Sequence, residues 1–280
     1  MRRFAVVTTC HAAGYQSYGR LMVETFAEFW PREVPLLLYH EGFEPAPIPG
    51  RLVARDLLAS SPELVAFKKR HADNPRAHGH IKPWRRLKLG RLSIPVPLRV
   101  KKARYRWDAV RFSHKTFAIF HAARHTDADV LIWIDADTRF FAPLDPAELD
   151  TLAPADCGLA CLRRPKFTEC GFVVYNLRDP AMQDFLADFE RLYTDDGFWA
   201  EREYHDSWLF DVARVRAQKN AGMRVRDLGE GLGWYASHVL INSRLGRFMD
   251  HMKGDRKDAG CSRADDLLVA RSEEYWTHPR

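Results

Sequence analysis

The first half of the chain alternates between two hydrophobic patterns. Phe4–Thr9 and Val34–Tyr39 are short, mostly apolar runs of the kind that form buried strands. Between them, apolar side chains recur at helical spacing from Tyr18 to Phe29, with Ser17 as the predicted N-cap and Pro31 as the stop. The pattern therefore predicts a strand–helix–strand unit.

The alternation continues along the chain. A helix is predicted from Ser113 to about Arg124, followed by a strand over Val130–Ile134 that is apolar at every position and so covered on both faces. Later segments give helices from Asp179 and over His205–Arg216, and strands over Gly158–Leu162, Cys170–Leu177, Met223–Leu228 and His238–Ile241. We expect an α/β fold with a mixed, mostly parallel sheet flanked by helices. No composition shift marks a boundary, so residues 1–280 are expected to form a single domain.

Charge is distributed unevenly. Residues 68–111 hold 15 Lys and Arg and two acids, a net charge of +13, whereas the remainder carries −7. Basic residues alternate there with Trp, Leu and Ile, and Pro95 and Pro97 disfavour long regular elements. We predict that residues 68–111 are a basic insertion, which either contacts a polyanion or an anionic membrane surface or is a solvated segment that maintains solubility. No RNA-binding signature or finger pattern occurs, which argues against nucleic acid as the partner.

Composition excludes several classes of protein. With 46% hydrophobic residues, 16 Gly and 16 Pro, the sequence is not that of a collagen, a coiled coil or a disordered chain. No apolar run reaches the length of a spanning helix, and the segment through Thr9 is too short for a secretory signal. The expected location is cytoplasmic, with peripheral contact at the inner face of the membrane through residues 68–111.

The sharpest candidate for chemistry is Asp135-Ala136-Asp137, which directly follows the strand Val130–Ile134. In extended chain, residues i and i+2 point to the same side, so the two carboxylates repel unless a cation lies near them. Mg²⁺ and Mn²⁺ prefer carboxylate oxygens, and ligands of α/β sheets bind beyond the carboxyl ends of the strands. The alternative is that both carboxylates simply cap the loop after a strand.

A second candidate lies near the C-terminus, in His251-Met252-Lys253-Gly254-Asp255-Arg256-Lys257. A histidine offers a neutral nitrogen ligand, a glycine lets the backbone approach a phosphate, and a lysine supplies positive charge. These residues could complete a metal–diphosphate site. Taken alone, the segment fits an exposed polar turn better than a binding site.

In order and approximate separation, the two motifs resemble those of metal-dependent nucleotide-sugar glycosyltransferases of the A-type fold (GT-A). The sequence is most similar to glycosyltransferase family 8, the glycogenin- and galactosyltransferase-like group, over most of the chain except residues 45–110. The resemblance implies Mn²⁺ (or Mg²⁺) bound by Asp135, Asp137 and His251, with Asp135, Gly254 and Lys257 at the donor diphosphate. It also implies a hexosyltransferase that moves a sugar, with retention, from a nucleoside-diphosphate sugar, expected to be a UDP-sugar, to a glycan or lipid-linked acceptor.

Further site residues follow from the same resemblance. Glu169–Leu177 is similar to the family's strand that lines the sugar pocket, which implies roles there for Glu169 and Gly171. His205–Trp208 falls where the family has an Asp-Gln-Asp-like segment; Asp206 would hold sugar hydroxyls, and Ser207 replaces the glutamine near the anomeric carbon. Asp206, Glu169 and Ser207 are thus the catalytic candidates. The resemblance also implies a substrate contact by Lys115, on the helix before the strand Val130–Ile134. It implies that Thr8, Thr9 and Tyr15 contact the uracil and ribose.

Departures from the family pattern leave the donor sugar, the acceptor and the stereochemistry open. An inverting enzyme would need a carboxylate base, for which Asp206 or Glu169 would serve. Two other classes compete with a glycosyltransferase. One is a catalytically inactive polyanion- or membrane-binding protein on the same fold. The other is a nucleotidyltransferase, but Cys10–Tyr15 lacks the basic phosphate loop expected of that class.

Overall fold

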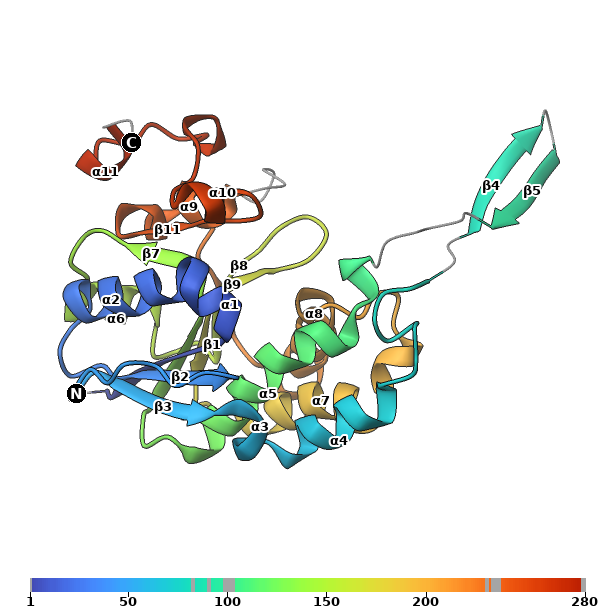
Figure 1. The fold of residues 1–280 in the computed structure, drawn as a ribbon, viewed down its shortest axis with the longest axis horizontal. Coiled ribbons are helices and arrows are strands. Elements are labelled where there is room, and N and C mark those ends of the chain that lie inside the picture. Colours follow the sequence, from blue (N-terminus) through green and yellow to red (C-terminus); the bar gives the residue numbers. More distant parts are fainter. Residues whose placement is uncertain are drawn as a thin grey trace.

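A mixed seven-stranded sheet has the strand order β10-β8-β9-β6-β1-β2-β3. Figure 1 shows the path of the chain and the helices around this sheet. The computed structural model describes residues 2–81, 84–89, 92–97, 104–229, 232 and 238–277. The strands of the sheet are β1 (Phe4–His11), β2 (Leu36–Glu41), β3 (Leu52–Asp56), β6 (Val130–Ile134), β8 (Leu159–Leu162), β9 (Glu169–Asn176) and β10 (Val225–Asp227). Only β9 pairs antiparallel to its neighbours in this sheet, which confirms the predicted mixed, mostly parallel α/β architecture.

Helices cover both faces of the sheet. The longer ones are α2 (Arg20–Phe29), α4 (Pro62–His71), α5 (Ala109–His125), α6 (Pro146–Leu152), α7 (Met182–Thr194) and α8 (Asp206–Ala221). The short ones are α1 (Ala12–Gly14), α3 (Leu57–Ser60), α9 (Val239–Asn242), α10 (Arg256–Ala259) and α11 (Glu274–Thr277). No helix in the described parts of the chain combines the length and the apolar composition that crossing a lipid bilayer requires.

Strand β6 shows how the sheet divides the core in two. Leu131 and Trp133 belong to the apolar cluster under α4, α5, α7 and α8, whereas Val130, Ile132 and Ile134 belong to the cluster under α2, α6 and α9. Alternate side chains of a strand point to opposite faces, so an uninterrupted apolar run is needed when both faces are covered.

The orientation of β9 brings two chain segments to one edge of the sheet. Because β9 runs antiparallel to β6, with Phe172 opposite Ile134, its amino end lies beside the carboxyl end of β6. A separate two-stranded sheet, β7 (Thr138–Phe140) and β11 (Met249–His251), begins just past that edge and pairs His251 with Thr138. This small sheet brings the C-terminal segment to the end of β6.

Several helix limits differ from the predicted ones. The first helical run begins at Ala12, where the Nδ1 atom of His11, rather than Ser17, accepts a hydrogen bond from Gly14 N. Helix α5 begins at Ala109 with Asp108 as its cap, and Ser113 is buried inside it. The predicted strand over His238–Ile241 is wrong, because these residues lead into and form α9.

The basic stretch 68–111 contains more regular structure than its prolines predict. It begins in α4, ends in α5 and includes a 3-10 helix over Tyr105–Trp107. It also contains an antiparallel hairpin of β4 (Trp84–Leu89) and β5 (Leu92–Pro97), which extends away from the rest of the molecule in Figure 1. Pro95 and Pro97 lie in β5, a two-stranded setting in which each strand has an unpaired edge, the position where proline is tolerated.

Candidate functional site

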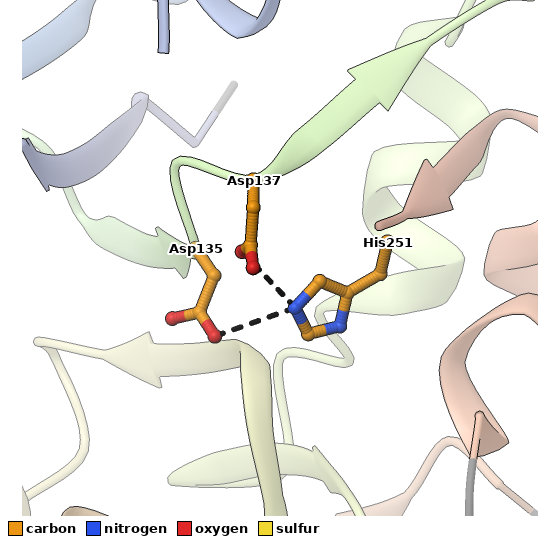
Figure 2. A group of neighbouring side chains, drawn as sticks. All are labelled: Asp135, Asp137 and His251. Carbon is orange, nitrogen blue, oxygen red and sulfur yellow. Dashed lines mark ion pairs between the residues drawn. The ribbon is translucent and has the colours of Figure 1, made fainter. Parts of the chain in front are cut away.

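The three side chains predicted to bind a metal ion converge beyond the carboxyl end of β6. Asp135 and Asp137 flank the turn between β6 and β7, and His251 reaches them from β11 (Figure 2). The Nε2 atom of His251 lies 3.2 Å from Asp137 Oδ1 and 3.5 Å from Asp135 Oδ2. One ligand atom from each residue lies within 4.8 Å of the others. The two motifs that are far apart in the sequence therefore form a single cluster.

The backbone around the cluster is fixed by hydrogen bonds between strands. Asp135 N donates to Gly171 O at 3.0 Å, and Met252 N donates to Asp137 O at 2.9 Å. Gly171 leaves room for the imidazole, since a Cβ atom there would lie 2.4 Å from His251 Cε1. The sequence needs glycine at this position because the ring of His251 packs directly against the backbone of β9.

The donor set fits a divalent metal ion. Two carboxylates and one imidazole nitrogen are ligands that Mn²⁺ and Mg²⁺ sites accept. Within the described residues, the Nδ1 atom of the buried His251 has no hydrogen-bond partner, so its ring is held mainly by the two carboxylates. A metal ion bound to the three residues would supply the positive charge that the protonated imidazole supplies to the carboxylates here.

Two lysines neutralise the carboxylates from opposite sides. Lys257 Nζ lies 2.8 Å from Asp137 Oδ2 and 4.6 Å from the centre of the Tyr18 ring. Lys115, on α5, places Nζ 2.8 Å from Asp135 Oδ1 and 2.9 Å from Asp206 Oδ2, and it also donates to Cys170 O at 2.6 Å. Lys115 thus ties the end of β6 to the first residue of α8.

The charged state of the cluster follows from these contacts. Burial alone would raise the pKa of Asp135, but Lys115 and His251 lower it far below its usual range. Burial would lower the pKa of His251, but Asp137 and Asp135 raise it to about 9. Burial likewise disfavours the charged form of Lys115, yet Asp135 and Asp206 raise its pKa well above the ordinary value. The carboxylates are therefore ionised at neutral pH, as metal ligands must be.

A cavity of about 860 Å³ adjoins the cluster and is lined by all three predicted catalytic residues. Asp206 and Ser207 enter it from the start of α8, and Glu169 enters it from the start of β9. Glu169 is buried and ion-paired with Lys253 and, at 3.1 Å, with Arg164. Burial would raise the pKa of Glu169, but Lys253 and Arg164 lower it to about 2.

The residues predicted to contact the uracil and ribose, Thr8, Thr9 and Tyr15, do not line this cavity. Thr8 is buried in β1, and Thr9 donates its hydroxyl to Tyr39 O at 2.7 Å. Tyr15 stacks on Phe43 with ring centres 4.5 Å apart and lines a smaller hollow of about 350 Å³. Gly254, by contrast, lines the 860 Å³ cavity; it adopts φ +62° with no atom within 4 Å of an added Cβ, so the backbone of its turn is open to approach. Of Thr8, Thr9 and Tyr15, the last two are partly exposed.

Sequence reasoning missed several residues of the site. Trp133, assigned to the core, donates Nε1 to Asp135 Oδ1 at 2.7 Å. Its position two residues before Asp135 on the same strand was the available signal, because such residues share a face. Lys253 gave no comparable signal, since its pairing with Glu169 joins segments that only the fold brings together. Arg164 is near Glu169 in the chain, in the loop between β8 and β9, but no periodic pattern marks the pair.

Comparisons with known proteins give similarity of fold alone. No protein-family model matches the sequence, and no curated protein matches it. Among solved structures, the chain is similar to an active-site mutant of LgtC, with 12% identity over 95% of this chain and 84% of that one and a TM-score of 0.46. Mouse xyloside xylosyltransferase 1 gives 10% identity over 80% and 84% of the two chains with a TM-score of 0.46. The bifunctional glycosyltransferase WbbM gives 13% identity over 81% of this chain but 39% of its own length, with a TM-score of 0.45. Function is therefore inferred from the side chains at the site.

Proposed function

We propose that this protein is a metal-dependent glycosyltransferase of the GT-A type. It transfers a hexose from a nucleoside-diphosphate sugar, with UDP as the expected nucleotide, to a glycan or lipid-linked acceptor. The observation that carries the proposal is the convergence of Asp135, Asp137 and His251 within 4.8 Å beside a cavity large enough for a sugar. The cluster also lies past the carboxyl end of β6, where α/β sheets bind ligands.

The cations of the site suit a diphosphate leaving group. When bound, Mn²⁺ or Mg²⁺ would supply Lewis-acid stabilisation of the charge that develops on that group. Lys257, ion-paired with Asp137, adds a second positive charge at the same place, and the open turn at Gly254 lets backbone approach the phosphates. Both residues act by electrostatics and require no proton transfer of their own.

Asp206 and Lys115 would orient the donor sugar. The Asp206 carboxylate faces the cavity from the first turn of α8 and is held by Lys115, so it can accept hydrogen bonds from sugar hydroxyls without moving. Lys115 is itself held by Asp135, which couples the position of the sugar to the position of the metal ligands. A fixed geometry of this kind lowers the entropic cost of reaching the transition state.

The low pKa and the ion pairs of Glu169 favour a transfer with retention of configuration. An inverting transfer needs a general base with a pKa near the working pH. Glu169, with its pKa lowered to about 2 and two cationic partners, is a weak base, and Asp206 is ion-paired with Lys115. Both carboxylates are better suited to stabilise an oxocarbenium-like sugar. In this scheme the leaving phosphate takes the proton of the acceptor hydroxyl. Ser207 would lie near the reacting carbon.

Calorimetric titration of UDP tests the proposal. The wild-type chain is expected to bind UDP with Mn²⁺ and to lose binding more than tenfold with EDTA. Asp137→Asn should show the same loss because it removes a ligand charge while keeping the shape of the side chain. Asp184→Asn, an exposed carboxylate in the first turn of α7, removes the same charge elsewhere and should bind as wild type.

The outcomes separate the candidate classes. Metal-dependent binding of UDP, or of GDP or another nucleoside diphosphate, followed by turnover of the matching sugar donor, supports a glycosyltransferase. If no nucleotide binds with metal present and Asp137→Asn changes nothing, the proposal is wrong. The inactive polyanion- or membrane-binding alternative then takes its place.

A further inference from the structure

The outer part of the 860 Å³ cavity is lined by aromatic rings, unlike the charged cluster of Asp135, Asp137 and His251. Three rings line it and surround the imidazole of His205, which is buried at 2% exposure. Phe167, Phe112 and Tyr105 have their ring centres 4.7, 6.1 and 6.0 Å from that of His205. Tyr105 is 53% exposed, so an aromatic surface faces the opening of the cavity.

His205 fixes this aromatic wall in place. Its Nε2 lies 3.0 Å from Glu203 Oε2, and Glu203 in turn pairs with Arg106. Burial lowers the pKa of His205 despite Asp206 and Glu203, so the ring is held as an uncharged platform at neutral pH. Aromatic surfaces in ligand pockets bind apolar faces, and the C–H face of a sugar ring is one of these.

The carboxylates of the cavity are already paired with cations. Asp135 and Asp206 share Lys115, and Glu169 pairs with Lys253 and Arg164. A ligand that enters the outer part of the cavity therefore meets little unbalanced negative charge.

Among the residues that the structure describes, two cations that line the cavity have no carboxylate partner. Arg111, in the first turn of α5, has its guanidinium 5.7 Å from the Phe112 ring centre, and Lys166 precedes Phe167. Both side chains are exposed, and neither forms an ion pair with any residue in the described portion of the chain. They flank the aromatic wall and leave its opening positively charged.

We infer that the cavity accepts a sugar that carries a negative group, a carboxylate or a phosphate, as the acceptor. The sugar ring packs on the wall of Tyr105, Phe112 and Phe167, and Arg111 and Lys166 bind the anionic group. The inference rests on the proposed function, since it assigns the acceptor of that same site. It narrows the acceptor from any glycan to an acidic one.

Three matched probes test the preference for an acidic sugar. They are the p-nitrophenyl glycosides of glucose, glucuronic acid and glucose 6-phosphate. Their binding is measured by ligand-observed NMR in the presence of UDP and Mn²⁺, which occupy the diphosphate region. At least one acidic probe is expected to bind about tenfold more tightly than the neutral glucoside, the effect of two exposed charge contacts. Tighter binding of the glucuronide identifies a uronic acid, and tighter binding of the 6-phosphate identifies a phosphosugar.

Variants then locate the effect. Arg111→Gln combined with Lys166→Gln should remove the preference for the acidic probe and leave the neutral probe unchanged. Lys69→Gln combined with Lys219→Gln removes the same charge from exposed positions outside the cavity and should keep the preference. Equal binding of acidic and neutral probes by the wild-type chain overturns the inference, as does a preference that survives Arg111→Gln/Lys166→Gln.

A separate UDP titration keeps the two proposals apart. If UDP binds with Mn²⁺ but no acidic probe is preferred, the glycosyltransferase proposal stands and the acidic acceptor is wrong. If the preference depends on Arg111 and Lys166 but UDP never binds, the acidic-sugar pocket stands and the transferase proposal is wrong.

Discussion

Asp135 receives contacts from four elements of the fold. Lys115 approaches it from α5, Trp133 from β6, the backbone of Gly171 from β9 and His251 from β11. Lys115, Trp133 and His251 contact the carboxylate, while Gly171 O accepts from the backbone N of Asp135. These contacts fix the side chain in one orientation, as the proposed metal site requires. The same contacts make the position sensitive to changes in its neighbours.

Gly171→Ala tests that sensitivity. The new Cβ would lie 2.4 Å from His251 Cε1 and 2.7 Å from Nδ1, so the imidazole must move away from Asp135 and Asp137. We expect metal-dependent UDP binding to fall more than tenfold, with about 1–3 kcal/mol lost from the free energy of unfolding. Calorimetry and urea unfolding measure the two effects.

Gly222→Ala is the matched control, because it separates the two effects. Gly222 ends α8 at φ +66° in open space, so alanine there costs about 1–2 kcal/mol of stability without touching the site. If both variants weaken UDP binding alike, instability rather than displacement of His251 is the cause, and the packing argument fails.

Sequence motifs located the ligands but not their supports. Asp135 and Asp137 were predicted from their position directly after a buried strand, and His251 from the resemblance to a known motif; the fold brings all three together. The anchors of Glu169 come from Lys253 and Arg164, which are distant in the chain from each other. Such pairs leave no periodic signal, since the fold alone determines which charges meet.

At the scale of elements, α5 and β2 are joined by a polar contact. The hydroxyl of Tyr39 on β2 is hydrogen-bonded to Nδ1 of His121 on α5 at 2.7 Å, and His125 stacks on His121 with ring centres 4.0 Å apart. Burial and the neighbouring His125 lower the pKa of His121 to about 4. The folded chain therefore holds this imidazole uncharged at neutral pH.

A pH dependence of stability follows from His121. Between about pH 6.5 and pH 4 the unfolded chain binds a proton at this histidine that the folded chain does not, so stability falls as the pH is lowered through that range. His121→Gln should show a smaller drop in the urea midpoint between pH 7 and pH 5 than the wild-type chain. His80→Gln, an exposed histidine, should show the wild-type drop. Equal drops in all three chains would contradict the assignment.

Long-range contacts explain where the predicted elements were wrong. Val239-Leu240-Ile241 is a short apolar run, and such runs fit a buried helix turn as well as a strand. Asn242 decides between them, because its amide donates to His238 O and Asp266 O while its oxygen accepts from Leu268 N. The fully apolar run Val130–Ile134 was correctly predicted as a strand. It leads straight into Asp135 at the edge of the sheet.

At the scale of the whole molecule, the strongly basic stretch 68–111 separates into a part within the body and a part outside it. Arg70 and Arg106 pair with Asp196 and Glu203 in the body, whereas the β4–β5 hairpin extends outward in Figure 1. A lone two-stranded hairpin is marginally stable in water, so a bound surface would stabilise it. Contact with an anionic membrane through this stretch stays a prediction.

Vesicle sedimentation checks that prediction. The chain is expected to bind vesicles containing anionic phosphatidylglycerol at least tenfold better than neutral phosphatidylcholine vesicles, and to lose binding as salt rises. Replacing residues 82–103 by a short Gly-Ser linker should abolish vesicle binding. The same replacement should leave UDP titration unchanged, since the metal cluster lies elsewhere. Unchanged vesicle binding after the replacement would exclude the hairpin region as the contact.

The lysines around the cluster have a consequence for the metal ion that we propose. Lys115 and Lys257 already balance the charges of Asp135 and Asp137, so the loaded and the unloaded chain can share one fold. Removal of the ion by a chelator should then abolish nucleotide binding without melting the protein, unlike zinc fingers, in which the metal holds the chain together. Occupancy would follow the free concentration of the ion, and the ion could leave with the spent nucleoside diphosphate and return with the next donor.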